Sequence, residues 1–353
     1  MRILVTGGAG FIGSNFVWHL LQQKGLRVRV LDKLTYAGNL DNFPVAVKAD
    51  PRFEFVRGDI GRPETVRAAL KGVDAVVNFA AETFIDRSID SVSPFVSTDF
   101  VGTYVLLEEF RRNPCDRLVH VSTCEVYGSA RTVPMAEDHP MEPQSPYAAT
   151  KAGADRLCYS YFRTYGLPVV ILRPFNQYGP NQYPEKVIPF FFTSALRDQP
   201  LYVYGAGRNT RDWTYVSDLC SLVQKVIEVK RERVAGEVFH AGSGEEKSVL
   251  DIAAAVLAYL GKPKSLLQHI KDRPGHVERL VCDTRKTKRV LGWQAETRFD
   301  DGLSRTLAWY EANAGWWQKI MRRREYQEFY RRWYFGTLGA VCKSRRAGSR
   351  EKK

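Results

Sequence analysis

Two short segments of the chain carry five side chains whose types suit acid–base and redox chemistry. These residues are Thr123, Cys124, Glu125, Tyr147 and Lys151. The first three follow an apolar run, residues 118–121, which predicts that they lie at the carboxyl end of a strand, where open α/β sheets place their ligands. The last two are four residues apart, so in a helix their side chains share one face. A hydroxyl, a thiol, a carboxylate, a phenol and an ammonium could therefore meet at one site.

A glycine-rich turn follows the first expected strand, residues 3–6. Gly7, Gly10 and Gly13 form this turn, with Phe11 and Ile12 at the start of an amphipathic run. Glycine permits the tight turn, lets backbone N–H groups approach a pyrophosphate at the helix N-terminus, and lets the helix pack on the strand. The turn therefore predicts a dinucleotide site.

The second expected strand, residues 28–31, ends in an acid. Asp32 lies about 20 residues after the turn, where a carboxylate can bind the adenosine ribose hydroxyls. An acid at this position disfavours a 2′-phosphate, so we expect NAD rather than NADP. Lys33, the next residue, is assigned to the same cofactor site.

Two further strand ends supply the remaining candidates for cofactor binding. After residues 53–56, Asp59 could hold the adenine amino group with the ring against Ile60, although Asp59 could equally cap a helix. After residues 75–79, the small side chains of Ala80 and Ala81 would let the nicotinamide approach.

Strands alternate with long helical patterns at residues 94–112 and 147–165, which predicts an α/β fold. We expect a Rossmann-type doubly wound parallel sheet with a smaller C-terminal α/β substrate lobe. The predicted domains are residues 1–173 for the NAD-binding domain, joined by some later segments, 174–318 for the substrate lobe, and 319–353 for a basic aromatic extension.

The composition of the 353 residues favours a cytoplasmic enzyme. The net charge is +13, but residues 319–353 hold twelve of the basic and only three of the acidic side chains, so the body is nearly balanced and a nucleic-acid partner is not expected. Six cysteines lie apart with no C-x-x-C pair, which disfavours a metal site and a disulfide framework. The apolar runs are too short for stable membrane insertion.

Several stretches, in order, resemble the extended short-chain dehydrogenase/reductase superfamily and, within it, the dTDP-glucose 4,6-dehydratase branch of nucleotide-sugar enzymes. They are the glycine turn with the Tyr147–Lys151 pair, and residues 31–39, 80–89, 184–189, 211–216 and 273–276. The similarity extends from residue 1 to about residue 317.

This resemblance implies a redox-neutral dehydration on retained NAD. Tyr147 would take the C4 hydroxyl proton, with Lys151 favouring the phenolate and Thr123 hydrogen-bonding the C4 oxygen. The resulting 4-ketone acidifies the C5 hydrogen, which Glu125 would remove as general base. Loss of the C6 hydroxyl and return of the hydride would give a 4-keto-6-deoxy sugar.

The resemblance also implies a nucleotide-sugar substrate and a homodimer formed by the helices near residues 98–112 and 147–165. Asn176, Lys186 and Arg211 match positions that hold the diphosphate, and Arg273 and His276 match positions near the nucleoside. The remaining substrate-binding candidates are Thr83, Arg87 and Tyr204.

Cys124 departs from the family pattern, which has an aspartic acid as general acid at this position. Cys124 could serve as the acid. It could instead be a bystander, with Glu125 acting as both base and acid. In a third interpretation the C6 elimination is altered or absent, as in an epimerase, a decarboxylase or a dehydratase that forms a 5,6-alkene.

Other departures leave the nucleobase and sugar open among UDP-glucose, UDP-N-acetylglucosamine and dTDP-glucose. Asp99 replaces a usual Asn, and His240 replaces an Asn that contacts the nucleotide.

The extension carries an aromatic stripe at helical spacing. A membrane-surface helix could have such a stripe, but we expect this one to pack on its own domain or on a partner subunit. Its members are Tyr326, Phe329, Tyr330, Trp333 and Tyr334. The basic residues after Gly339 are predicted to be disordered.

Overall fold

A computed structural model describes residues 1–337, which form two compact units. The first unit comprises Met1–Gln182, Thr210–Lys247 and Val277–Thr306. The second comprises Tyr183–Asn209, Ser248–His276 and the chain from Leu307 onward. Each unit is therefore assembled from segments far apart in the sequence. Cys342 and the predicted disorder after Gly339 lie outside the described residues.

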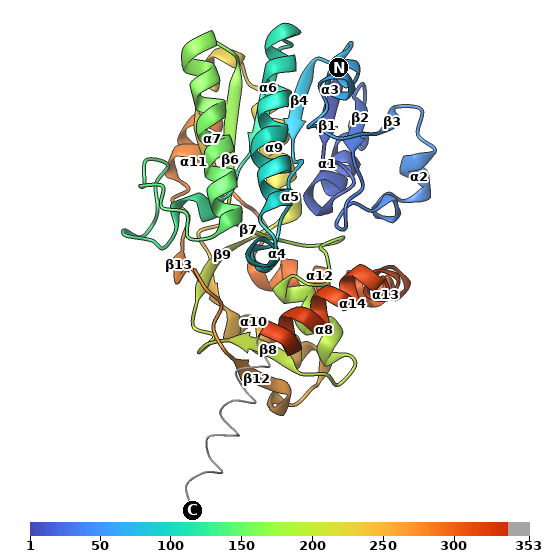
Figure 1. The fold of residues 1–353 in the computed structure, drawn as a ribbon, viewed down its shortest axis with the longest axis vertical. Coiled ribbons are helices and arrows are strands. Elements are labelled where there is room, and N and C mark those ends of the chain that lie inside the picture. The colour runs from blue at the N-terminus through green and yellow to red at the C-terminus, as the bar shows by residue number, and fades with distance from the viewer. Residues whose placement is uncertain (338–353) are drawn as a thin grey trace, which may run out of the picture. The chain divides into compact units, whose positions relative to one another are not determined.

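The first unit is built on a parallel sheet of seven strands in the order β10-β6-β5-β4-β1-β2-β3 (Figure 1). The order reverses between β1 and β4, which is the position where doubly wound sheets bind their ligands. The strands are β1 (Arg2–Thr6), β2 (Arg27–Asp32), β3 (Phe53–Arg57), β4 (Ala75–Asn78), β5 (Arg117–Val121), β6 (Val169–Pro174) and β10 (Val238–Ala241).

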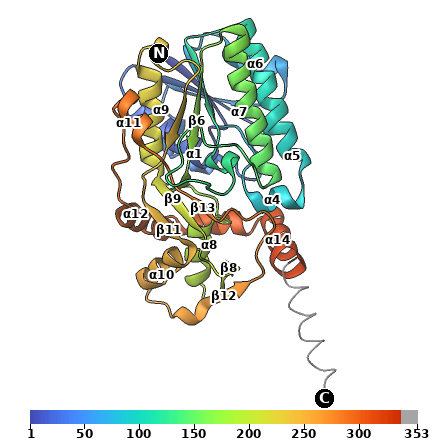
Figure 2. The same ribbon diagram turned by 90° about the vertical axis from the view of Figure 1, so that its left-hand side faces the viewer.

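Helices cover both faces of this sheet, so the central strands are buried throughout and read as nearly continuous apolar runs. One face packs on α1 (Phe11–Leu21), α9 (Val216–Glu228) and α11 (Arg285–Leu291). The opposite face packs on α3 (Pro63–Leu70), α6 (Thr103–Arg112) and α7 (Pro146–Tyr165). Figure 2 shows α9 and α11 on one side of the sheet and α6 and α7 on the other. The predicted α/β fold class is confirmed.

The segment predicted as one helix at residues 94–112 is helical but not uniform. It consists of the short α5 (Ser93–Phe95), a wider π-helical segment η2 (Val96–Gly102) and α6. Such π-helical segments are frequent at functional sites. Here the segment contains the fully buried Asp99.

Helix α7 begins and ends where its sequence predicts. The Ser145 side chain accepts a hydrogen bond from the Ala148 N–H at 3.2 Å, and Pro146 occupies the first turn. Gly166 ends the helix in the left-handed conformation, with φ of 66°. These signals fix the helical register of Tyr147 and Lys151, which lie on the first two turns.

Short elements complete the first unit. A second sheet has the order β11-β9-β13, with β7 also paired to β9. Its strands are β7 (Asn176–Tyr178), β9 (Thr210–Tyr215), β11 (Glu246–Ser248) and β13 (Arg279–Leu280). The remaining helical elements are η1 (Leu40–Asn42), α2 (Val45–Lys48), α4 (Ile85–Asp90), η3 (Cys124–Tyr127) and η4 (Arg231–Arg233).

The second unit contains a parallel pair of strands, β8 (Leu201–Tyr204) and β12 (Leu267–Ile270). Its helices are α8 (Val187–Ala195), α10 (Val249–Leu260), η5 (Lys264–Leu266), α13 (Ala314–Met321), α14 (Arg324–Tyr330) and η6 (Arg331–Thr337). Helix α12 (Phe299–Ala312) begins in the first unit and continues into the second.

The aromatic stripe of the extension packs on the second unit. Tyr326, Phe329 and Trp333 are buried. The ring of Tyr334 stacks on Tyr202 of β8, with the ring centroids 4.9 Å apart. Of the two predicted alternatives, its own domain or a partner subunit, the stripe therefore packs on its own domain.

Candidate active site

The predicted catalytic segment lies at the carboxyl end of β5. Thr123 caps the short helix η3, and its hydroxyl oxygen accepts a hydrogen bond from the Glu125 N–H at 3.2 Å. The Lys151 ammonium donates a hydrogen bond of 2.8 Å to the carbonyl oxygen of Val121, the last residue of β5. Helix α7 is thereby joined to the strand end, and the two predicted catalytic segments meet.

Tyr147 lies within hydrogen-bonding reach of the Thr123 side chain. Burial raises the pKa of the Tyr147 phenol, and the nearby Asp99 carboxyl raises it further, whereas the Thr123 hydrogen bond lowers it. Burial also lowers the pKa of Lys151, while Asp99 opposes that shift. In the chain by itself the phenol is therefore protonated, and it needs an additional positive charge nearby before it can act as a base.

Glu125 is buried and faces a cation. Arg211 Nε lies 3.7 Å from Glu125 Oε1, and both side chains are almost fully buried. The same guanidinium donates to three backbone carbonyl oxygens, those of Thr210, Val277 and Glu278. The sequence predicted Arg211 as a ligand of the diphosphate, and the structure adds that Arg211 orients the carboxylate of the predicted C5 base.

Cys124 is buried at the start of η3, with 2% of its surface exposed. Burial raises the pKa of the thiol well above its usual value, and the Glu125 carboxylate raises it further, against a smaller lowering by Arg211. The thiolate that would remain after proton donation is therefore strongly disfavoured. Of the roles considered for Cys124, that of general acid is the least favoured by its surroundings.

Asp99 is a member of the site that sequence reasoning noted only as a departure. Its side chain is fully buried and accepts hydrogen bonds from the Glu82 N–H at 2.8 Å and the Thr150 hydroxyl at 3.0 Å. Burial raises its pKa to about 7, against the lowering effect of Lys151. Asp99 and Lys151 are both buried and lie close enough for each to shift the pKa of the other, and η2 packs on the helix α7 that carries Lys151 and Tyr147.

The glycine turn is packed closely against neighbouring backbone. Gly7 has a φ of 67°, and a Cβ there would lie 2.5 Å from the Ala80 nitrogen, while a Cβ on Gly13 would lie 2.4 Å from the Gly7 oxygen. The first turn of α1 contains no acidic residue, and its N-cap Gly10 offers no side-chain acceptor. The free N–H groups at this helix end can therefore receive a pyrophosphate.

The residues predicted to bind the adenosine part of the cofactor also lie close together. Asp32 ends β2, is largely buried, and accepts hydrogen bonds from the N–H groups of Ala9 and Leu34. A carboxylate has about four acceptor positions, so ribose hydroxyls can be added to these two bonds. Lys33 Nζ lies 3.7 Å from Asp59 Oδ2 and 3.5 Å from Glu82 Oε1.

Asp59, which could hold adenine or cap a helix, accepts a hydrogen bond of 2.8 Å from the Gly61 N–H. Its neighbour Ile60 is buried in the apolar core that α3 and α6 share. Ala80 lies directly beside Gly7, as the close approach of its nitrogen shows, and Ala81 follows at the end of β4. The predicted cofactor residues therefore gather around one edge of the sheet.

The predicted substrate residues fall into both units. Thr83, Arg87, Asn176 and Arg211 belong to the first unit, and Lys186, Tyr204, Arg273 and His276 belong to the second. In the first unit, the Tyr36 hydroxyl donates to the Thr83 carbonyl oxygen at 3.1 Å, and the Arg87 guanidinium lies over the Tyr36 ring at 3.9 Å. Asn176 is the first residue of β7.

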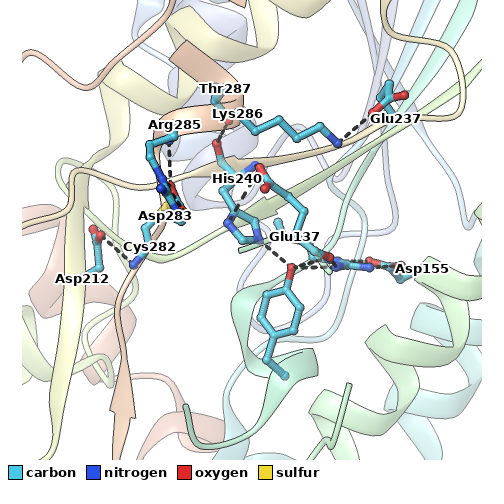
Figure 3. Close-up of polar contacts among 12 residues, drawn as sticks. Glu137, Asp155, Asp212, Glu237, His240, Cys282, Asp283, Arg285, Lys286 and Thr287 are labelled. Atoms are coloured by element: carbon cyan, nitrogen blue, oxygen red, sulfur yellow. Dashed lines mark hydrogen bonds and ion pairs between the residues drawn. The ribbon is translucent and has the colours of Figure 1, made fainter. Parts of the chain in front are cut away.

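A buried polar network supports η3 and was not found from the sequence. Arg173 pairs with Asp155 through bonds of 2.8 and 2.9 Å and donates to the Tyr127 hydroxyl at 2.6 Å. The same hydroxyl contacts His240 Nε2 at 2.5 Å. Arg173 also donates to the Glu137 carbonyl oxygen at 3.0 Å, and Figure 3 labels His240, Glu137 and Asp155 of this network. His240 is thus a buried structural residue of β10, with its pKa lowered to about 3 by burial.

Asp212, the residue after Arg211, also has a supporting role. It is fully buried, and its carboxylate accepts hydrogen bonds from the N–H groups of Ser243, Gly244 and Cys282. Figure 3 shows the Cys282 contact. Burial raises the pKa of Asp212 to about 6. The Asp212 carboxylate therefore links its own strand, β9, to residues 243–244 and to residue 282, next to the Glu125–Arg211 pair.

Residues 1–337 contain no group of three His, Cys, Asp or Glu side chains arranged to hold a metal ion. Within the same residues no helix combines the length and apolar character needed to cross a bilayer. The five cysteines among them are unpaired.

The parallel sheet, the glycine turn after β1 and the Tyr147–Lys151 pair at the end of β5 define an enzyme of the extended short-chain dehydrogenase/reductase class. The family model described as GDP-mannose 4,6 dehydratase matches residues 4–306, and the chain belongs to this family. The resemblance stated from the sequence is confirmed.

Similar proteins cover nearly the whole chain. A dTDP-glucose 4,6-dehydratase of Actinoplanes sp. is 47% identical over 323 residues, which are 90% of this chain and 100% of that protein. The crystal structure of a dTDP-glucose 4,6-dehydratase from Streptomyces venezuelae, with NAD and TYD bound, superposes with a TM-score of 0.87 at 46% identity and covers 91% of this chain and 100% of that chain.

A second kind of chemistry occurs on the same fold. The UDP-glucuronic acid 4-epimerase from Bacillus cereus, solved with UDP-glucuronic acid and NAD, has a TM-score of 0.84 and 31% identity, covering 88% of this chain and 99% of that chain. The fold alone therefore does not separate a dehydratase from an epimerase.

The raised pKa of Asp99 makes stability depend on pH. Between pH 3.8, where this carboxyl ionises in an unfolded chain, and about pH 7, where it ionises in the fold, the folded chain keeps a proton that the unfolded chain loses. Over this interval, rising pH should destabilise the wild type relative to Asp99→Asn, by up to about 4 kcal/mol in the free energy of unfolding. Urea titrations of both proteins at half-unit pH steps measure the difference, and parallel pH curves would contradict the assignment.

Proposed function

We propose that the protein is an NAD-dependent nucleotide-sugar 4,6-dehydratase that acts on dTDP-glucose. The observation that carries the proposal is the meeting of Thr123, Glu125, Tyr147 and Lys151 at the end of β5, in the same unit as a glycine turn shaped for a dinucleotide. The matches to dTDP-glucose 4,6-dehydratases over about nine-tenths of the chain support dTDP-glucose among the candidate substrates.

In the first half of the reaction, the C4 hydroxyl of glucose loses its proton to Tyr147 and is oxidised to a ketone. NAD supplies the hydride acceptor for this oxidation and the hydride donor for the later reduction at C6, and its positive nicotinamide is the charge that the buried phenol lacks. Thr123, which already contacts Tyr147, positions the reacting oxygen. Lys151 is held by Val121 and adds positive charge at the base of the site.

In the second half, the 4-ketone acidifies the C5 hydrogen, and Glu125 removes it as a proton. The resulting carboxylic acid can then protonate the departing C6 hydroxyl, so one side chain acts first as base and then as acid. When hydride returns to C6, C5 regains a proton, and the proton that Tyr147 took from the C4 hydroxyl completes the balance. The Arg211 guanidinium lies 3.7 Å from the Glu125 carboxylate and can orient it toward C5. This assignment rests on the burial of Cys124, which raises the pKa of its thiol and so disfavours proton donation.

Mass spectrometry of a substrate panel tests the proposed reaction. The purified protein with NAD should convert dTDP-glucose to a product lighter by one water, and UDP-glucose and UDP-N-acetylglucosamine test the choice of nucleotide and sugar. An isomer of unchanged mass would indicate an epimerase, and loss of CO2 from a nucleotide uronic acid would indicate a decarboxylase. A dehydrated product that retains an alkene would show that hydride does not return to C6.

Substitutions at residues 124 and 125 separate the two possible acids. Glu125→Gln should lower kcat for dehydration by about 10²- to 10⁴-fold, since it removes the general base. Cys124→Ala should keep kcat within about three-fold of the wild type, well short of the 10²-fold loss of a general acid. Cys220→Ala is the matched control, because Cys220 is also a buried thiol but lies on α9, in the apolar core on the face of the sheet opposite to α7. A hundred-fold loss confined to Cys124→Ala would make the thiol the acid.

The proposed oligomer is a homodimer formed through η2, α6 and α7. Apolar and aromatic side chains on these helices are exposed in the single chain. They are Val96, Phe100, Val101, Tyr104, Tyr159 and Tyr165. Burial of such side chains against a second copy would remove them from water, which is the usual driving force of a two-fold interface.

Charged substitutions on this surface test the dimer. Val101→Asp combined with Tyr104→Asp should convert a dimer of about 80 kDa into a monomer of about half that mass by light scattering, because two carboxylates would be buried unpaired. Val45→Asp, at a position that is 81% exposed on α2, is the control and should leave the mass unchanged. A monomeric wild type would refute the interface.

A cytoplasmic location stays a prediction of the sequence.

A further inference from the structure

The C-terminal extension makes a specific polar contact within the second unit. The indole N–H of Trp333, in η6, donates a hydrogen bond of 2.7 Å to the hydroxyl of Tyr204 at the end of β8. Trp333 is 2% exposed, so its N–H is directed at this hydroxyl in a largely dry environment. Residues 307–337 lie beyond the end of the family-model match, so the family match does not account for this contact.

Tyr204, a predicted substrate-binding residue, lies beside His276 and Arg273, which match positions near the nucleoside. Its ring meets the His276 imidazole edge-on, with centroids 6.1 Å apart. The Arg273 guanidinium lies 5.9 Å from the ring centroid. His276 Nδ1 in turn contacts Asp272 Oδ1 at 2.6 Å. An imidazole and a guanidinium therefore lie against one aromatic ring, and planar groups of these kinds can stack on a planar heterocycle.

The extension is held firmly enough to position a side chain. Tyr334 stacks on Phe190 of α8 with centroids 5.4 Å apart, and on Tyr202 of β8 with centroids 4.9 Å apart. Trp333 itself stacks on Phe329 one turn earlier, with centroids 6.1 Å apart. These contacts place Trp333 on a packed surface, which limits its rotamers.

We propose that Trp333 is a positioning residue for nucleotide binding: its hydrogen bond holds the Tyr204 ring in the orientation that receives the nucleobase of the substrate. This inference rests on the proposed nucleotide-sugar function. Without the bond, the Tyr204 ring would have to be ordered when the nucleotide binds, and that ordering reduces affinity. Trp333 acts through Tyr204, so its effect appears in binding of the nucleotide and not in the chemical steps.

Trp333→Phe and Tyr204→Phe remove the donor and the acceptor of this bond while keeping an aromatic ring at each position. Each should weaken binding of dTDP and raise KM for dTDP-glucose about five-fold, as expected for one net hydrogen bond. The kcat and the affinity for NAD should stay within about two-fold. The double variant should be no weaker than either single variant, because both remove the same bond.

Trp317→Phe is the matched control. The Trp317 indole N–H, buried in α13, donates to the Tyr310 carbonyl oxygen at 2.9 Å, so this variant also loses a buried indole hydrogen bond in the C-terminal region. It should lower the melting temperature without changing the dissociation constant for dTDP. Isothermal titration calorimetry with dTDP and thermal unfolding of all four variants provide the comparison.

The outcomes distinguish the inference from the proposed function. If wild type binds dTDP and Trp333→Phe binds it equally well, or if the effects of Trp333→Phe and Tyr204→Phe simply add, the inference is overturned and the proposed function stands. If wild type neither binds dTDP nor dehydrates any nucleotide sugar of the panel, the proposed function itself fails. A five-fold loss of dTDP affinity without additivity supports the inference.

Discussion

The hydrogen bond from the Lys151 ammonium to the Val121 carbonyl oxygen is the contact on which the catalytic site depends. It joins the second turn of α7 to the last residue of β5, and so brings Tyr147 next to Thr123. A buried ammonium is costly unless it is paired, and the nearby Asp99 carboxyl offsets part of that cost. The Lys151 ammonium and the Asp99 carboxyl therefore help to hold the site together and also shift the pKa values of the groups within it.

A second layer of buried polar groups restrains the short helix that carries Cys124 and Glu125. The ion pair of Asp155 with Arg173 is almost fully excluded from water, and burial would raise the pKa of Asp155, but the two Arg173 hydrogen bonds hold it at about 2. Arg173 also donates a hydrogen bond to the hydroxyl of Tyr127, which lies three residues after Cys124 and so restrains the same short helix. Buried polar networks of this kind rigidify the elements that they connect.

The sequence predicted much of the site because the relevant signals are local. At Gly7 and Gly13 a Cβ would meet neighbouring backbone atoms. Only glycine lacks a Cβ, so this requirement can be read directly from the sequence. The register of Tyr147 and Lys151 follows from the capping residues of one helix. Asp99 was recognised only as an unusual residue, because its burial and its pKa depend on how η2 packs against α7. A π-helical segment has no simple sequence signature.

The sequence by itself predicted the parallel sheet and the glycine turn, because each follows from periodicity or from spacing within one element, whereas the roles predicted for the acid–base residues came from resemblance to a known family. Only the tertiary structure decided what those residues can do. Arg211 faces Glu125 because β9 approaches η3, and Cys124 is a poor acid because the fold excludes water from its thiol. Trp333 meets Tyr204 although 129 residues separate them. Burial and long-range proximity set these pKa values and contacts, and neither is a property of any single segment.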